Sequence, residues 1–202
     1  MIAGPGPGPS PEPSVPPSVP PSSAPEWSLS VGPREPDPTQ IDHSRQSESD
    51  AQWLARTIEL ATANVAVGGG PFGALIVRDG VLVAEGQNRV TASLDPTAHA
   101  EVVAIRAACQ AVGDFSLVGA TLYTSCEPCP LCLSAALWAR VERVVYAADR
   151  DDAARGGFDD REFYELFARD RSTWNVTIDS LRPADASAPF DAWLAKIDRT
   201  DY

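Results

Sequence analysis

Apolar residues recur at helical spacing in the first part of the chain that has any regular pattern. The stretch SDAQWLARTIELATANVAVGGG starts with polar residues, and its apolar positions share one face of a helix: Trp53, Leu54, Ile58, Ala61 and Val65. Gly68 provides a C-terminal stop. The pattern therefore predicts an amphipathic helix from about residue 50 to this glycine.

Two β-rich runs follow, in PFGALIVRDGVLVAEGQN. Asp79-Gly80 joins them, and this dipeptide suits the two-residue turns of β-hairpins. Next, DPTAHAEVVAIRAACQAVG predicts a helix in which Asp95 is the cap, Pro96 takes the first position and Gly113 ends the helix.

Strands and helices continue to alternate up to the last residue. ATLYTS and VERVVYAAD predict strands on either side of a helix in PCPLCLSAALWAR. DREFYELFARD then predicts a helix, WNVTIDS an extended segment, and SAPFDAWLAKIDRTDY a helix that runs to the C-terminus. This alternation predicts a single three-layer α/β domain over residues 49–202.

Composition separates the first 48 residues from that domain. Thirteen of the 19 prolines lie in the first forty residues, in runs such as GPGPGPSPEPSVPPSVPPSS. So few aliphatic side chains cannot bury enough surface to offset the entropy of ordering the chain. We expect residues 1–48 to form a disordered, proline-rich tail.

The formal charge is −12, with an excess of acids in both the tail and the predicted domain. Such a balance disfavours nucleic-acid binding and favours a small ligand. No apolar run reaches the roughly 18 residues of a membrane-spanning helix, and no signal peptide is recognisable. A cytoplasmic location is therefore expected, and in a reducing compartment clustered cysteines bind metals more often than they form disulfides.

The residues that carry chemistry lie at the openings of two predicted helices. Cys129 and Cys132 are three positions apart at a helix start, so their sulfurs face the same way, and the helix N-terminus stabilises thiolates. His99, in TAHAE, adds a third ligand, which leaves the fourth position of a tetrahedral zinc for water. Glu101 would move protons between that water and a substrate. The combination H-x-E … P-C-x-x-C is the pattern of zinc-dependent deaminases.

Other uses of the cysteines remain open at this stage. Cys126 could join His99, Cys129 and Cys132 in a closed structural zinc site, and the protein would then be an interaction domain rather than an enzyme. A redox C-x-x-C pair is a further alternative. Neither gives Glu101 a role, so we favour the open, catalytic site.

Longer strings resemble one family within this class. DPTAHAEVVAIRAAC, LYTSCEPCPLCLSAALWAR and GGFDDREFYE are similar to bacterial guanine deaminases of the cytidine-deaminase fold, from about residue 50 to the terminal Tyr202. The resemblance implies a five-stranded mixed sheet between helices, one zinc per chain, and a homodimer that exchanges C-terminal segments. Leu131 and Ser134 depart from the methionine and glycine that relatives often carry.

The resemblance also implies a set of substrate contacts. Asn88 would hydrogen-bond the purine, Phe72 would pack on its ring, and Asp160 would read the ring nitrogen and amino edge. Further contacts would come from the backbone of Ala100, from Trp138 and from the terminal Tyr202. Each has an ordinary alternative: Asn88 could only end a strand, Phe72 and Trp138 could only pack, and Asp160 could only cap a helix.

The expected reaction is hydrolysis of guanine to xanthine and ammonia. Guanosine, cytosine or cytidine, an aminotriazine and adenosine in tRNA are alternative substrates within the same class.

Overall fold

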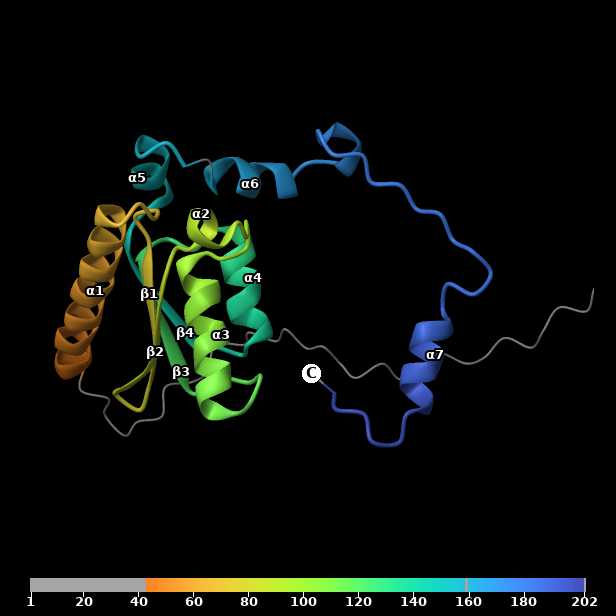
Figure 1. Ribbon diagram of the computed structural model, residues 1–202, viewed down its shortest axis with the longest axis horizontal. Helices are drawn as coiled ribbons and strands as arrows, with labels where there is room; N and C mark the ends of the chain where they lie inside the picture. The colour runs from red at the N-terminus through yellow and green to blue at the C-terminus, as the bar shows by residue number, and fades with distance from the viewer. Residues whose placement is uncertain (1–42, 159, 202) are drawn as a thin grey trace, which may run out of the picture. The chain divides into compact units, whose positions relative to one another are not determined.

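The computed structural model describes residues 43–158 and 160–201, with side chains from Asp50 onward apart from Asp160 (Figure 1). Its elements, in chain order, are α1 (His43–Ala66), β1 (Gly73–Arg78), β2 (Val81–Gln87), α2 (Val90–Ser93), α3 (Ala100–Val112), β3 (Ala120–Cys126), α4 (Pro130–Trp138), β4 (Arg143–Ala148), α5 (Arg150–Arg155), α6 (Asp160–Phe167), η1 (Arg171–Thr173) and α7 (Ala188–Ala195). The predicted tail lies largely outside the described residues and stays a prediction, although α1 begins at His43, within the range 1–48.

The strands form one mixed sheet in the order β2-β1-β3-β4. β1 pairs antiparallel with both β2 and β3, whereas β3 and β4 run parallel. Helix α1 covers one face of the sheet, and α3 and α4 cover the other (Figure 1). This arrangement confirms the three-layer α/β fold.

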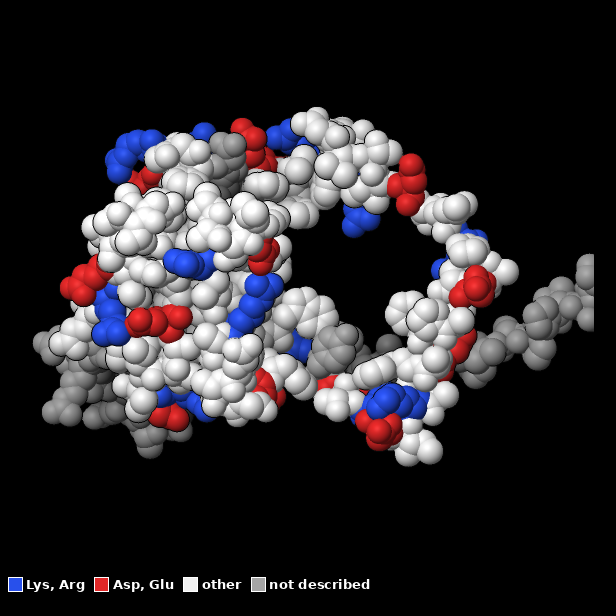
Figure 2. Space-filling view, viewed as in Figure 1, with Lys and Arg blue, Asp and Glu red and all other residues white. Residues whose placement is uncertain are grey.

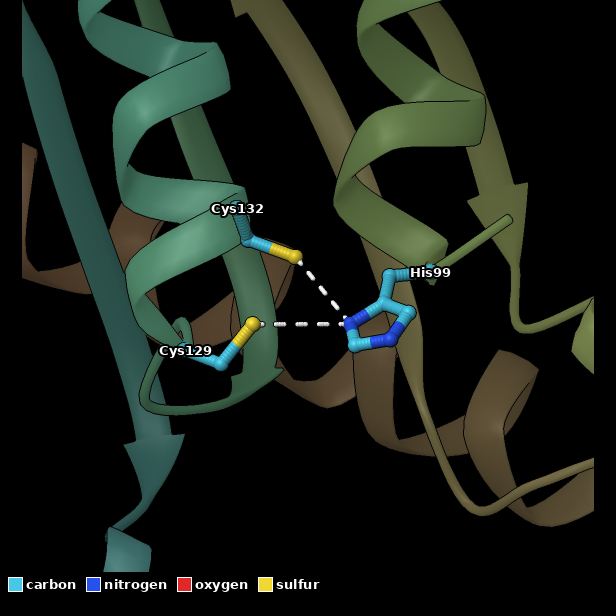
Figure 3. Close-up of side chains that lie close together, drawn as sticks. All are labelled: His99, Cys129 and Cys132. Atoms are coloured by element: carbon cyan, nitrogen blue, oxygen red, sulfur yellow. Dashed lines mark hydrogen bonds between the residues drawn. The ribbon is translucent and has the colours of Figure 1, made fainter. Parts of the chain in front are cut away.

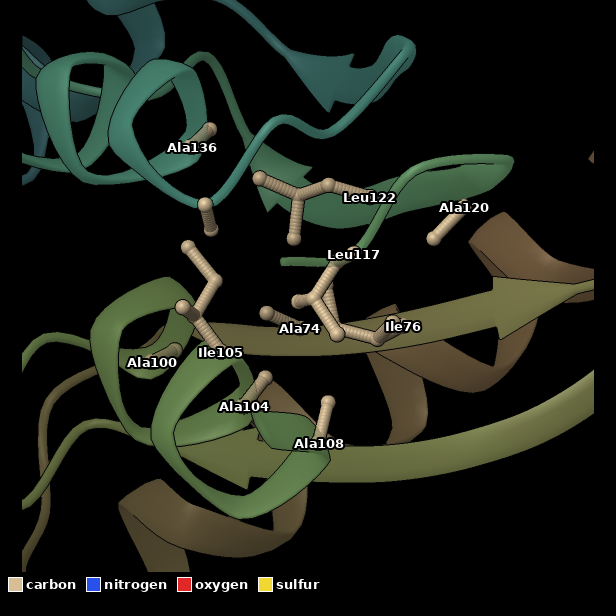
Figure 4. Close-up of a cluster of buried hydrophobic side chains, with 11 residues drawn as sticks. Ala74, Ile76, Ala100, Ala104, Ile105, Ala108, Leu117, Ala120, Leu122 and Ala136 are labelled. Carbon is tan, nitrogen blue, oxygen red and sulfur yellow. The ribbon is translucent and has the colours of Figure 1, made fainter. Parts of the chain in front are cut away.

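The period of two along the central strands places alternate side chains in different layers. Ala74 and Ile76 of β1 pack with Leu122 of β3 against α3 and α4 (Figure 4), whereas Leu75 and Val77 face α1. Both sets are buried, so β1 is apolar at every position from Ala74 to Val77 rather than alternating. The first cluster holds α3 and α4 side by side on one face of the sheet, and the second holds α1 on the other face.

The hairpin turn between β1 and β2 forms as predicted. Asp79 has a φ of 53° and Gly80 a φ of 72°, so both central residues take the left-handed conformation of the turn that fits the twist of two antiparallel strands.

The prediction of five strands is wrong for the described residues, which contain four. The segment WNVTIDS is not a strand, because no neighbouring strand accepts or donates its backbone hydrogen bonds. Two of its apolar side chains stay open to solvent, with Val176 65% and Ile178 53% exposed.

Two helix boundaries also differ from the prediction. Asp95 does not cap α3: its carboxylate accepts hydrogen bonds from the backbone N–H (2.8 Å) and hydroxyl (2.7 Å) of Thr97, which form a turn, and the helix begins at Ala100. Gly113 ends α3 in the left-handed conformation, as predicted. Helix α7 stops at Ala195, short of the predicted C-terminal end.

Candidate active site

His99 and Cys129 hold equivalent places at the starts of α3 and α4. Each is the extended residue immediately before its helix, with ψ values of 154° and 167°. Pro130 then takes the first position of α4, where its missing N–H costs no hydrogen bond. Because both helices pack on the same face of the sheet, their N-termini bring His99, Cys129 and Cys132 together (Figure 3).

The donor atoms have the separations that a tetrahedral zinc ion requires. His99 Nδ1 lies 3.5 Å from Cys129 Sγ and 3.4 Å from Cys132 Sγ, and the three donor atoms all lie within 4.8 Å of one another. Typical Zn–N and Zn–S bonds at a tetrahedral angle place nitrogen and sulfur about 3.6 Å apart. These three residues therefore fit zinc, as the sequence predicts.

The two thiols hold their protons differently. The neighbouring Cys132 thiol and the nearby His99 lower the pKa of Cys129 to about 4, so Cys129 is a thiolate near neutral pH. The adjacent Cys129 sulfur and burial raise the pKa of Cys132. Binding of a metal ion must therefore displace the proton of Cys132, which makes metal affinity increase with pH.

Glu101 lies in the first turn of α3 and is only 5% exposed. Its Oε2 accepts a hydrogen bond from Cys132 Sγ, at 3.3 Å. Burial raises the pKa of this carboxyl above its ordinary value, so it holds a proton more readily than an exposed glutamate does. A carboxyl group beside the metal ligands, with a raised pKa, is suited to accept and return protons.

Cys126 does not join the group that fits zinc. It is the last residue of β3, and its thiol donates a hydrogen bond to the backbone carbonyl of Asp149, at 3.5 Å. Among the described residues, the cluster of potential ligands around His99 contains Cys129 and Cys132 and no fourth protein ligand. This geometry favours the open site over the closed one.

A cavity of about 440 Å³ opens above these residues. His99, Glu101 and Cys129 form one part of its wall. The rest comes from the loop 68–70 and from Phe72, Asn88, Val90, Thr91, Glu127, Phe158 and Phe163. The ring of Phe72 meets that of Phe158 edge to face, with 4.8 Å between the ring centres. A flat, largely apolar ligand would fit between such walls.

The structure brings some of the predicted substrate contacts to this cavity. Phe72 and Asn88 line it, and Ala100 is a buried residue between His99 and Glu101. Trp138 does not line it: this residue ends α4, is 58% exposed, and lies with Phe115 along a different cavity. Asp160 begins α6 without a described side chain, and Tyr202 lies outside the described residues.

Sequence reasoning missed several residues that shape the cavity. Phe158 and Phe163 come from the segment around α6, and only their aromatic character in GGFDDREFYE could have indicated them. Glu127 precedes the metal-ligand loop and was not singled out. Thr91 and Val90, from the short helix α2, have no sequence signal at all.

A charged pair fixes the loop that carries Cys129. Arg150 donates two hydrogen bonds to the carboxylate of Glu127, one of them from Nε at 2.9 Å, and this lowers the pKa of Glu127. The Arg150 guanidinium also lies 4.0 Å from the centre of the Tyr164 ring, and the Tyr164 hydroxyl donates to the carbonyl of Pro128. The start of α5 and the middle of α6 are thereby tied to the ligand loop.

Comparison with known proteins agrees with this site. Residues 47–148 match the family model described as the cytidine and deoxycytidylate deaminase zinc-binding region, and the chain belongs to that family. Its cofactor is zinc, for which His99, Cys129 and Cys132 form the candidate site.

Particular relatives narrow the comparison. The chain is 47% identical to guanine deaminase of Bacillus subtilis over 151 residues, which are 74% of this chain and 97% of the relative. The crystal structure of that protein has a TM-score of 0.73, with 75% of this chain and 98% of that chain covered, at 46% identity. A solved structure in complex with 2,6-diaminopurine has a TM-score of 0.53, at 36% identity over 55% of this chain and 62% of that chain.

A tRNA-specific adenosine deaminase of Haemophilus influenzae is more distant. It is 38% identical over 104 residues, which are 51% of this chain and 60% of the relative.

Proposed function

We propose that this protein is a zinc-dependent guanine deaminase, which converts guanine and water to xanthine and ammonia. The observation that carries the proposal is the buried carboxyl of Glu101, 3.3 Å from a ligand thiol, in a site with three metal ligands that opens to a cavity. The similarity to the Bacillus subtilis guanine deaminase over nearly its whole length supports guanine as the substrate.

The proton transfers are assigned to Glu101. Zinc, when bound by His99, Cys129 and Cys132, supplies Lewis-acid activation of water. Glu101 accepts a proton from the attacking water and delivers it to the ring nitrogen beside the amino-bearing carbon. It then moves the remaining proton of that water, from the added hydroxyl, to the departing amine, so ammonia leaves and the carbonyl of xanthine forms. The raised pKa of Glu101 suits this alternation between acceptor and donor.

The base is held by contacts around the cavity. Asn88 hydrogen-bonds the purine and Phe72 packs on its ring, which agrees with the place of both in the cavity wall. Asp160 reads the ring nitrogen and amino edge, Ala100 contributes backbone groups, and Tyr202 closes the pocket. Trp138 lines a different cavity, so its contact with substrate stays a prediction from the resemblance.

Charge distribution favours a free base over tRNA. On the face shown in Figure 2, Lys and Arg atoms are interspersed with Asp and Glu atoms over α3 and β2, and no continuous basic surface is seen among the described residues there. The net charge of −12 points the same way.

We also propose that the protein is a homodimer in which C-terminal segments are exchanged. The segment after α6 leaves large apolar side chains open to solvent, with Leu181 94% and Phe190 70% exposed. An apolar groove of about 720 Å³, lined by Ile58, Val65 and Ala148 among others, lies between α1 and the edge strand β4. The exchanged segment of a second copy would cover this groove.

Among the described residues, no helix combines the length and the apolarity needed to cross a bilayer. We assign the enzyme to the cytoplasm, where cysteine ligands stay reduced.

An ammonia-release screen tests the substrate. Purified, zinc-loaded protein is assayed with guanine, guanosine, cytosine, cytidine, adenine and ammeline. We expect release of ammonia from guanine, with xanthine as the second product. Turnover of another compound without turnover of guanine would reassign the substrate, and no turnover of any of them would remove the proposed reaction.

A further inference from the structure

One buried amide lies behind the wall of the cavity without touching the metal site. Asn64 is in the last turns of α1, is fully buried, and does not line the cavity. Its Nδ2 donates two hydrogen bonds, to the backbone carbonyl of Gly70 at 2.9 Å and to that of Asn88 at 2.8 Å. Both acceptors belong to residues that line the cavity.

These two bonds fix the orientation of the amide group. Both partners are carbonyl oxygens, which only accept, so the nitrogen end must point towards them. An aspartate at this position has the same size but no N–H when ionised, and a leucine leaves both carbonyls buried without a donor. The position therefore requires an amide rather than a polar residue in general.

The backbone of Asn64 also shapes the loop 68–70. Its carbonyl accepts hydrogen bonds from the N–H of Val67, at 3.2 Å, and of Gly69, at 2.9 Å. A Cβ on Gly69 would lie 2.3 Å from Asn64 Nδ2, so only glycine allows the loop to approach the amide this closely. Asn64 thus fixes the path of the loop from both its backbone and its side chain.

The same nitrogen of the Asn64 amide also holds the backbone of Asn88. The N–H of Asn88 donates to the carbonyl of Phe72 at 3.1 Å, and its own carbonyl accepts from Asn64. Its Oδ1 accepts a hydrogen bond from the backbone N–H of Val90, with 3.3 Å between nitrogen and oxygen. The backbone of Asn88 therefore sets where its side chain lies in the cavity, and the Asn64 side chain holds that backbone by a hydrogen bond.

We propose that Asn64 is a positioning residue for the nucleobase, which acts by holding Asn88 and the loop 68–70 in the geometry that binds the ring. The proposal rests on the proposed function for the identity of the base, but the positioning itself does not depend on which base is bound. Asn64 reaches substrate only through Asn88 and the loop, since it lies behind both.

A double-mutant cycle tests this role. Asn64→Leu is expected to raise the KM for the base about tenfold, which corresponds to loss of one hydrogen bond between Asn88 and the base. We expect kcat to change by less than about threefold. In an Asn88→Ala background the same change is expected to raise KM by less than about threefold, because the contact through Asn88 is already absent and only the loop 68–70 is still affected. Asn64→Asp is measured in the same way, in case leucine prevents folding.

Thr57→Val is the matched control. Thr57 is equally buried on α1, but its hydroxyl donates to the carbonyl of Leu54, at 2.7 Å, and not to Asn88 or the loop. We expect a lower melting temperature with an unchanged KM. An unchanged KM in both Asn64 variants, or a full effect of Asn64→Leu in the Asn88→Ala background, would overturn the proposal.

Hydrogen exchange separates this proposal from the proposed function, because it needs no substrate. In the Asn64 variants, the amides of Gly69 and Asn88 should exchange at least about tenfold faster than in Thr57→Val. Equal exchange rates would contradict the positioning role even if guanine is turned over. The kinetic cycle uses whichever base the wild-type protein deaminates. If the protein does not deaminate guanine but deaminates another base, both tests of Asn64 can therefore still be carried out.

Discussion

At the scale of single residues, the site divides similar side chains between different tasks. Cys129 and Cys132 lie at a helix start within 3.5 Å of the same imidazole nitrogen, whereas Cys126 ends a strand and bonds to a backbone carbonyl. Glu101 is only two positions from His99 but contacts a thiol and the cavity instead of adding a fourth ligand. The four site residues differ from Cys126 because they lie at the starts of α3 and α4, whereas Cys126 ends β3.

These assignments were accessible from sequence because spacing on a helix fixes direction. Cys129 and Cys132 are three positions apart at the start of α4, so their sulfurs lie on the same side of the helix. His99 and Glu101 are two positions apart, so both lie at the start of α3. Asn64 was not accessible in this way. Its role depends on carbonyls of Gly70 and Asn88, and the loop and the hairpin that place them beside α1 are tertiary structure.

At the scale of elements, the site depends on how closely α3 packs on the sheet. Gly86 of β2 faces the first turns of this helix, and a Cβ there would lie 2.3 Å from the carbonyl of Ala100 and 2.5 Å from the N–H nitrogen of Ala104. Backbone atoms cannot rotate away as a side chain can. The glycine therefore sets the distance between β2 and the helix that carries His99 and Glu101.

Gly86→Ala should consequently destabilise the fold. We expect the free energy of unfolding, measured by urea denaturation, to fall by about 3 kcal/mol, as for overpacking of a well-filled core. Glu85→Ala, on the neighbouring exposed position, removes a surface ion pair with Arg56 and should cost less than about 1 kcal/mol. Equal losses in the two variants would show that the close approach of α3 is not required.

The regular elements were predicted well where a periodic pattern is bounded by a turn residue. The hairpin at Asp79-Gly80 and the end of α3 at Gly113 are examples, because positive φ angles there favour particular residues. The start of α3 was predicted wrongly, since Asp95 can satisfy backbone donors in a turn as well as at a helix cap. The expected strand in WNVTIDS failed because a strand requires a partner that local sequence does not specify.

At the scale of the whole molecule, the exposed apolar residues of the C-terminal segment need a partner. Leu181, Phe190, Leu194 and Ile197 are each at least 66% exposed. Burial of such side chains against a second copy would stabilise the dimer by about 25 cal/mol for each Å² of apolar surface removed from water. The proposed exchange of C-terminal segments would account for this exposure and for the open edge of β4 together.

Removal of residues 170–202 tests the exchange. Light scattering should give a dimeric mass for the full chain and a monomeric mass for the truncated one. The truncated protein should also lose guanine turnover, because it lacks Tyr202, which we propose closes the pocket. Its zinc content should stay at one ion per chain, since all three ligands lie before residue 133. A monomeric full chain, or a truncated dimer with full activity, would contradict the exchanged dimer.

We propose that Glu101 moves the protons of a hydrolysis at a three-ligand zinc site, and xanthine formation from guanine tests this role directly. It is measured for the wild-type protein and for Glu101→Gln, with zinc content determined in both. Glutamine keeps the size of the side chain and cannot take up a proton. We expect one zinc per chain in both proteins and a loss of at least about 100-fold in kcat for the variant. Near-normal turnover by a zinc-loaded Glu101→Gln protein would rule out this role of Glu101.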